Sequence, residues 1–251
     1  MLADPLFLAA CLVSVLVLGL AKGGFAGIGM VATPLLALFV PPLQAAAILL
    51  PILLVQDAIS VWAYRRDWDA WNLKVMMPGA LVGIGVAWAL AAYLPDMWVR
   101  LLVGLIGLAF VLNAWFGHLP PQVKQPSAAK GAFWGGLSGL TSTLVQAGSP
   151  PFQIFVLPQR LPKLTFVGTN AVFFAAMNFL KLVPYASLGQ FSGKTFETSL
   201  LLLPLAIVAN FFGLWLVRVT PQQLFYKISY FLMFCISVAL TFDSLRALIR
   251  H

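Results

Sequence analysis

The sequence is poor in charged residues. Only 9% of its 251 residues are Asp, Glu, Lys or Arg, whereas 61% are hydrophobic. Soluble domains contain about 25% charged residues, so a soluble fold has too little polar surface to cover this much apolar side chain. The composition therefore predicts an all-α polytopic membrane protein, for which the lipid bilayer is the solvent.

Cysteine and histidine are also scarce, which excludes most metal and catalytic chemistry. Cys11 and Cys235 lie inside apolar runs without disulfide or metal-ligand spacing, and His118 and His251 have no partners for a catalytic triad. We therefore expect no enzyme activity, no metal and no cofactor. A cleaved signal peptide is not predicted, because the residues before the first apolar run include an acid, Asp4, but no base.

Acidic residues are fewer than basic ones, and the formal net charge is +8. Lys and Arg lie mostly in the short breaks between apolar runs, where the positive-inside rule accounts for them, so nucleic acid is not an expected partner. The apolar runs cover residues 5–21, 25–40, 43–64, 75–94, 98–116, 131–145, 152–157, 164–185, 199–217 and 224–245. A polar link separates the first five runs from the rest.

The two groups of runs resemble copies of one unit. The matching positions are Gly23 and Gly139, Pro34 and Pro150, Asp57 and Asn178, and Pro78 and Pro204. The spacing between partners grows stepwise along the chain, as loop insertions would make it; chance agreement of prolines in apolar sequence is the alternative. We predict a first membrane repeat at residues 1–117, a cytoplasmic linker at 118–130 and a second membrane repeat at 131–251.

Each repeat contains about four to five hydrophobic segments, and we expect its first hairpin to be broken or re-entrant. With five segments in each repeat, most Lys and Arg residues fall on one face of the membrane, which favours inverted repeats and a cytoplasmic linker. Inverted repeats with interrupted helices are typical of secondary transporters, whose substrate sites lie near the bilayer midplane.

Glycines and small polar residues gather at matching places in both repeats. A helix broken there would free backbone N–H groups and direct its positive end at an anion. The candidate substrate-binding residues are Lys22, Gly23, Gly24, Gly27, Gly29, Thr33, Ser138, Thr141, Ser142, Gln146, Gly148, Ser149 and Asn170. Helix packing is the alternative, because Gly131, Gly135 and Gly139 also form a small-residue packing pattern.

Ionisable groups in the middle of a span are candidates for function. Asp57, with Gln56 beside it and Asn178 as its repeat partner, is a candidate for coupling transport to protons. The alternative is an ion pair between Asp57 and Lys22, Arg65 or Arg66. Lys181 lies near the end of a span, so it either meets an anion or extends to the lipid headgroups.

These residues carry a resemblance to a known family. The pattern Gly19-x-x-Lys22-Gly23-Gly24-Phe25, then Thr33-Pro34-Leu35-Leu36, Asp57 and Pro78-Gly79-Ala80, resembles the TauE/SafE family of sulfite and organosulfonate transporters. Gly148-Ser149-Pro150 and Gly168-Thr169-Asn170 resemble its degenerate second copy.

The resemblance implies a multi-pass protein of the bacterial inner membrane that moves a small sulfur-containing anion, such as sulfite, sulfoacetate or a related organosulfonate, usually as an exporter. Its expected partners are this anion and the lipid bilayer, and a homo-oligomer is left open. A passive anion channel and an integral-membrane enzyme acting on a lipid-linked substrate are the alternatives.

Overall fold

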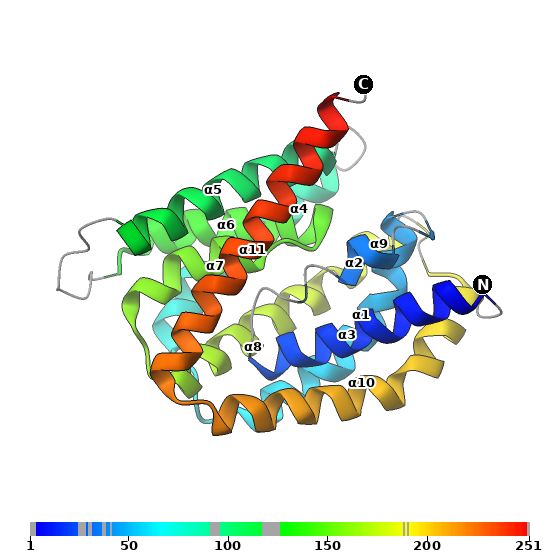
Figure 1. Cartoon of the computed structure of the whole chain (residues 1–251), viewed down its shortest axis with the longest axis horizontal. Coiled ribbons are helices and arrows are strands. Elements are labelled where there is room, and N and C mark those ends of the chain that lie inside the picture. The colour runs from blue at the N-terminus through cyan, green and yellow to red at the C-terminus, as the bar shows by residue number, and fades with distance from the viewer. Residues whose placement is uncertain are drawn as a thin grey trace. The chain divides into compact units, whose positions relative to one another are not determined.

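The computed structural model describes residues 4–24, 29, 32–36, 39–40, 42–90, 96–116, 126–187, 189 and 191–249. All regular structure in these residues is helical (Figure 1). The elements are α1 (Pro5–Gly23), α2 (Ala32–Leu36), α3 (Pro42–Ala63), α4 (Ala70–Leu90), α5 (Asp96–Phe116), α6 (Ala128–Val145), α7 (Ser149–Val156), the 3₁₀ turn η2 (Leu157–Gln159), α8 (Lys163–Leu180), α9 (Leu182–Ser187), α10 (Gly193–Val219) and α11 (Gln222–Ile249).

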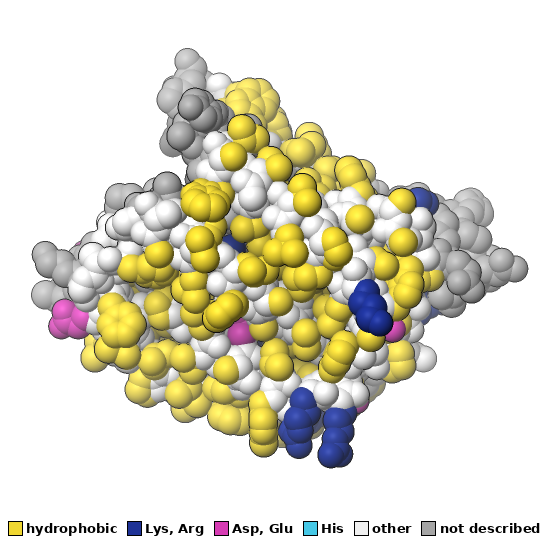
Figure 2. All heavy atoms as spheres, turned by 180° about the vertical axis from the view of Figure 1, so that it is seen from behind, with side chains coloured by type: hydrophobic (Ala, Val, Ile, Leu, Met, Phe, Trp, Pro, Cys, Tyr) yellow, Lys and Arg dark blue, Asp and Glu magenta, His cyan; other side chains and the backbone are white. Residues whose placement is uncertain are grey.

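Long apolar helices dominate the fold. Among the described residues, six helical stretches are long and apolar enough to cross a membrane: Pro5–Gly23, Gln44–Ala63, Ala70–Leu90, Lys163–Ser187, Thr195–Val219 and Gln222–Leu248. Large apolar side chains remain exposed on them, and Figure 2 shows a face on which hydrophobic side chains predominate and Lys and Arg are few. The prediction of an all-α multi-pass membrane protein is confirmed.

Local sequence explains where several helices begin and end. Asp4 caps α1 by accepting a hydrogen bond from the Leu6 N–H at 2.9 Å, and Pro5 supplies a first helical residue that needs no N–H partner. Ser192 and Thr195 form a reciprocal capping box at the start of α10. Gly24 ends α1 at a φ of 143°, a conformation that side chains with a Cβ rarely adopt.

The chain divides into two compact units, and each takes segments from both halves of the sequence. Unit 1 comprises Met1–Trp68 and Val167–Pro221, and unit 2 comprises Asp69–Phe166 and Gln222–His251. The first and second predicted repeats therefore both contribute helices to each unit. The repeat boundaries, their inverted relationship and the cytoplasmic placement of the linker stay predictions.

Unit 1 is held together by the packing of α10 against α1 and α3. Its apolar core includes Phe7, Cys11 and Val15 of α1, together with residues of α2, α3 and α10. Near the end of α1, a Cβ on Gly23 would collide with the backbone of Gly213 on α10. The two backbones can approach closely only because both positions are glycine.

Unit 2 contains a similar close pair, formed by α4 and α6. A Cβ on Gly135 or Gly139 of α6 would overlap the main-chain oxygen of Met76 or Ala80 on α4. α6 runs through both glycines without interruption to Val145. For this glycine pattern, the helix-packing alternative is therefore confirmed, and the expected helix break lies further along, at residues 146–148.

Two glycines two positions apart on α4 test this packing. A Cβ on Gly83 would overlap the Gly136 carbonyl oxygen and lie 2.8 Å from the Leu140 nitrogen, whereas a Cβ on Gly85 meets nothing within 4 Å. We expect Gly83→Ala to lower the free energy of unfolding by about 1–3 kcal/mol through overpacking. Gly85→Ala, the matched control, should be neutral or stabilising by up to about 1 kcal/mol through helix propensity. Unfolding in detergent measures both, and equal effects would contradict the packing described.

Candidate functional site

The end of α1 is the first part of the candidate site. Lys22 lies in the last turn of the helix, and Gly24 closes it by donating its backbone N–H to the Ala21 carbonyl at 3.1 Å. Two hydroxyls, one within α3 and one directly after it, complete the cap. Ser60 donates to the Lys22 carbonyl at 3.1 Å, and Tyr64 donates to the Gly23 carbonyl at 2.7 Å.

This geometry corrects the expectation that Gly23 and Gly24 expose free N–H groups to an anion. A helix C-terminus presents carbonyls, which carry partial negative charge, and the Gly24 N–H is already engaged. Burial raises the pKa of the Tyr64 phenol above its ordinary value, so this side chain stays a neutral donor to the Gly23 carbonyl. What the end of α1 offers to an anion is the Lys22 ammonium.

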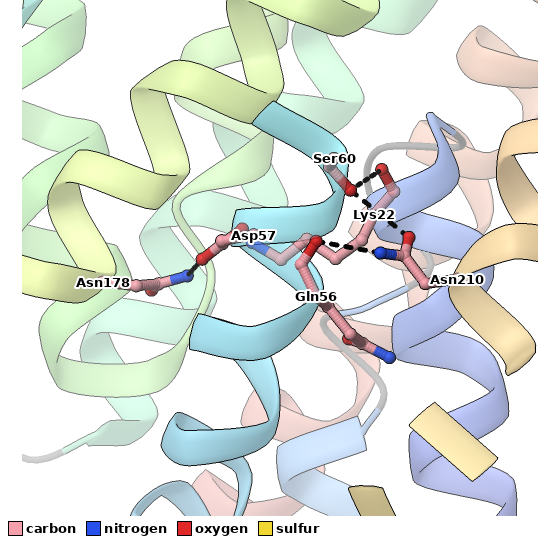
Figure 3. A network of polar contacts seen from close by, with 6 residues as sticks. All are labelled: Lys22, Gln56, Asp57, Ser60, Asn178 and Asn210. Atoms are coloured by element: carbon pink, nitrogen blue, oxygen red, sulfur yellow. Dashed lines mark hydrogen bonds and ion pairs between the residues drawn. The ribbon is translucent and has the colours of Figure 1, made fainter. Parts of the chain in front are cut away.

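Lys22 and Asp57 form a buried ion pair. The Lys22 Nζ lies 2.5 Å from Asp57 Oδ1, and the two residues are 9% and 2% exposed. The other carboxylate oxygen of Asp57, Oδ2, accepts a hydrogen bond of 2.7 Å from Asn178 Nδ2 on α8 (Figure 3). The ion-pair alternative is thus confirmed for Lys22, and Asp57 directly contacts its predicted repeat partner.

Lys181 brings a second positive charge to the same region. It lies between α8 and α9, it is fully buried, and it is within electrostatic reach of both Lys22 and Asp57. Its burial excludes the alternative that it extends to the headgroups. Two buried lysines therefore lie within electrostatic reach of one buried carboxylate.

One face of α8 lines this cluster. Asn170, Phe174, Asn178 and Lys181 recur at helical spacing, so they lie on the same side of the helix. The Lys22 Nζ is 5.7 Å from the centre of the Phe174 ring, a cation–π distance. Asn170 is 5% exposed, and no hydrogen bond to its Oδ1 is found among the described residues.

A hydrogen-bonded layer joins the other side of α3 to α10. Gln56 Nε2 donates to the Ala206 carbonyl at 3.1 Å, and Asn210 Nδ2 donates to the Gln56 carbonyl at 2.9 Å (Figure 3). The Ser60 hydroxyl also lies 3.3 Å from Asn210 Oδ1. Gln56 is fully buried, and among the described residues its Oε1 accepts no hydrogen bond. Buried acceptors of this kind are rare and often mark functional positions.

Three members of the predicted set are not brought to this cluster by any observed contact. Gly29 lies against α1, where a Cβ would be 3.0 Å from that of Ala21. Thr33 is buried in the short helix α2, whose Ala32 carbonyl accepts a hydrogen bond from Ser14. Gly27 lies outside the described residues.

Asn170 and Asn178 of the second repeat lie in unit 1, whereas its candidate residues between positions 138 and 149 belong to unit 2, where their hydroxyls hold the α6–α7 turn. Ser138 donates to the Gly148 carbonyl at 2.7 Å, Thr141 donates to the Ala147 carbonyl at 2.9 Å, and Ser149 accepts from Gln153 at 3.0 Å. Gln146 ends α6 in the left-handed conformation, and Ser142 is buried within the helix.

The N-terminus of α7 is a poor anion site for a further reason. Pro150 and Pro151 occupy its first turn, so two of the backbone N–H groups that usually serve an anion there are missing. A joint site built from the two glycine-containing segments remains a prediction, because these segments belong to different compact units.

Sequence reasoning missed three side chains of the cluster: Ser60, Tyr64 and Asn210. Ser60 and Tyr64 follow Asp57 by three and seven residues, the spacing of one helix face, and that signal was available. Asn210 is a polar residue deep inside an apolar span, which is also a recognisable signal. Metal binding has no support here, because the described residues contain no group of three or more His, Cys, Asp or Glu side chains placed to hold an ion.

Spanning helices around a buried charged cluster are typical of polytopic membrane transporters. A family model described as Sulfite exporter TauE/SafE matches residues 11–240. The chain belongs to this family of sulfite-exporter-type membrane transporters, as the sequence resemblance predicted. Comparison with curated proteins and with solved structures gives no match.

The ion pair makes a prediction about stability. Replacing either partner alone, as Lys22→Met or Asp57→Leu, leaves an uncompensated buried charge and should cost about 3–5 kcal/mol of unfolding free energy. The double variant Lys22→Met with Asp57→Leu should cost less than the sum, because neither member of the pair is then left without the other. A double-mutant cycle in detergent measures this coupling, and additive losses would show that the two side chains are energetically independent.

Proposed function

We propose that this protein is a secondary transporter that carries a small sulfur-containing anion, sulfite, sulfoacetate or a related organosulfonate, across the bacterial inner membrane. The family supplies the class of substrate. The observation that carries the proposal is the buried cluster of Lys22, its ion-pair partner Asp57, and Lys181 within electrostatic reach of both. Export by alternating access is the direction and mechanism proposed.

The buried cations of the cluster suit a monoanion. Ionised groups inside a membrane protein are costly unless they are paired, and two buried lysines lie here within electrostatic reach of each other. A sulfonate or hydrogensulfite ion brings a negative charge to them and accepts hydrogen bonds from ammonium groups, which are stronger than those between neutral groups. Asn170 and Asn178, on the same face of α8, would supply amide contacts to the oxyanion.

Asp57 is the proposed coupling residue. In the structure described it is the counter-ion of Lys22, and Asn178 fixes its second oxygen. A bound oxyanion competes with the Asp57 carboxylate for Lys22, and proton uptake by Asp57 ends this competition. Anion binding and protonation of Asp57 are thereby linked, while Gln56 orients this part of α3 through Ala206 and Asn210.

Two features support the predicted duplication and the proposed placement of the site. Asp57 and Asn178 occupy matching repeat positions and contact each other, as two residues beside a pseudo-twofold axis would. The close pair α1 with α10 also corresponds, under the predicted duplication, to the close pair α6 with α4. Sites at a repeat interface near the midplane are usual in secondary transporters.

Transport in proteoliposomes tests the substrate site. We expect Lys181→Gln and Lys22→Gln each to reduce sulfite or sulfoacetate flux by about tenfold to a hundredfold, the effect of losing a charged hydrogen bond. Lys130→Gln, at an exposed position at the start of α6, is the matched control and should leave flux unchanged. Wild-type flux in both lysine variants, confirmed to be folded, would refute the assignment.

A separate measurement tests coupling. Flux through the wild-type protein should depend on an imposed pH gradient, whereas flux through Asp57→Asn, which keeps the shape of the side chain but cannot change charge, should not. A wild-type protein that conducts the anion equally with and without a pH gradient would instead indicate a passive channel.

A further inference from the structure

Unit 2 contains a pocket that the proposed transport mechanism does not use. Its volume is about 460 Å³, within the usual range for small-molecule sites. It is lined by Trp115 at the end of α5, Arg160 after η2, and Gln222, Tyr226, Lys227 and Tyr230 in the first turns of α11. All of these residues belong to unit 2.

The charge of the pocket is positive. Arg160 and Lys227 line it and are exposed, and none of its lining residues is acidic. Arg160 is positioned by its backbone: its φ is 50°, and its N–H donates to the Leu157 carbonyl at 3.1 Å. Tyr226 of α11 donates to the Leu161 carbonyl at 2.6 Å, which ties this turn to the helix. Arg160 thus lies on a turn that is hydrogen-bonded to α11, and Lys227 lies on α11 itself.

The pocket also lies where a membrane protein meets the headgroup region. Its α11 residues begin the apolar span Gln222–Leu248, so they belong to one end of that span. Trp115, Tyr226 and Tyr230 are the aromatic types enriched at membrane interfaces. Trp115 packs against Phe234 with ring centres 5.2 Å apart, which fixes one wall of the pocket.

A lipid-facing stripe leads away from this pocket along α11. Its members are large apolar side chains with exposed fractions of 41% or more: Leu224, Phe231, Val238, Phe242 and Leu245. Their spacing keeps them on one face of the helix, and Lys227 lies between Leu224 and Phe231 at the border of that face. A pocket that carries two cations and an apolar stripe therefore adjoin, as a headgroup and its acyl chains do.

We propose that this pocket binds the phosphate headgroup of an anionic phospholipid, whose acyl chains lie along the exposed stripe of α11. Arg160 and Lys227 would contact the phosphate, Gln222 would donate a hydrogen bond to it, and the aromatic rings would pack on the glycerol region. Basic pockets between membrane helices recognise anionic headgroups in this way. A free phosphate ion would pair with the two cations, but it has no acyl chains to pack on the stripe.

Native mass spectrometry of the full-length protein, delipidated in an uncharged detergent, tests the proposal. We expect added phosphatidylglycerol to bind more tightly than phosphatidylcholine with the same acyl chains. Arg160→Gln and Lys227→Gln should each weaken phosphatidylglycerol binding by about fivefold, and together by about twenty-five-fold. Lys227→Arg, which keeps the charge, should retain most of the binding, and Lys130→Gln, an equal charge loss outside the pocket, should have no effect.

Two outcomes would overturn the proposal. In one, the double variant keeps the wild-type preference for phosphatidylglycerol, or Lys130→Gln weakens binding as much as the pocket variants do. In the other, inorganic phosphate displaces the lipid as effectively as a second phospholipid does, which would make the pocket a site for a free anion. Neither outcome bears on the transport site, because the pocket and the Lys22 cluster belong to different compact units and this assay involves no transport.

Discussion

Unit 1 depends on a single constraint: Lys22 and Asp57 are both charged and both excluded from water. Burying either charge alone would be strongly destabilising, so α1 and α3 must pack together where the two side chains pair. The main-chain contacts around the pair have the same origin. With the end of α1 fixed beside α3, its last carbonyls accept hydrogen bonds from the hydroxyls of Ser60 and Tyr64, so they need no hydrogen bonds from water. The pair therefore positions a helix end as well as two charges.

The two glycine-rich segments show how similar sequences reach different structures. After Lys22, four glycines fall within seven residues, and α1 ends there. In α6 the glycines are spaced by four, each one faces α4, and the residues that follow Gly139 are Leu, Thr and Ser, so the helix continues. Regular spacing favours packing, whereas a dense run favours interruption. The duplication of a segment does not require both copies to keep the same role.

Composition and charge were enough to predict the membrane class. A charge in the middle of an apolar run selected Asp57, its repeat position selected Asn178, and the adjoining glycines selected Lys22. Helix spacing and mid-span polarity could also have found Ser60, Tyr64 and Asn210, but which groups these side chains bond depends on which helix lies beside which, and no periodicity records that. For the same reason the sequence did not reveal that each compact unit interleaves segments of both halves.

That interleaving has a consequence for how the protein is made. The ribosome releases α1 and α3 early, so Lys22 and Asp57 can pair while the nascent chain is short, but α10, which covers the Gly19 and Gly23 side of α1, is nearly the last helix to emerge. Until then the Gly19 and Gly23 side of α1 lacks the helix that covers it. α10 is synthesised after most of unit 2. A nascent chain stalled before residue 193 therefore cannot complete unit 1, since α10 begins there.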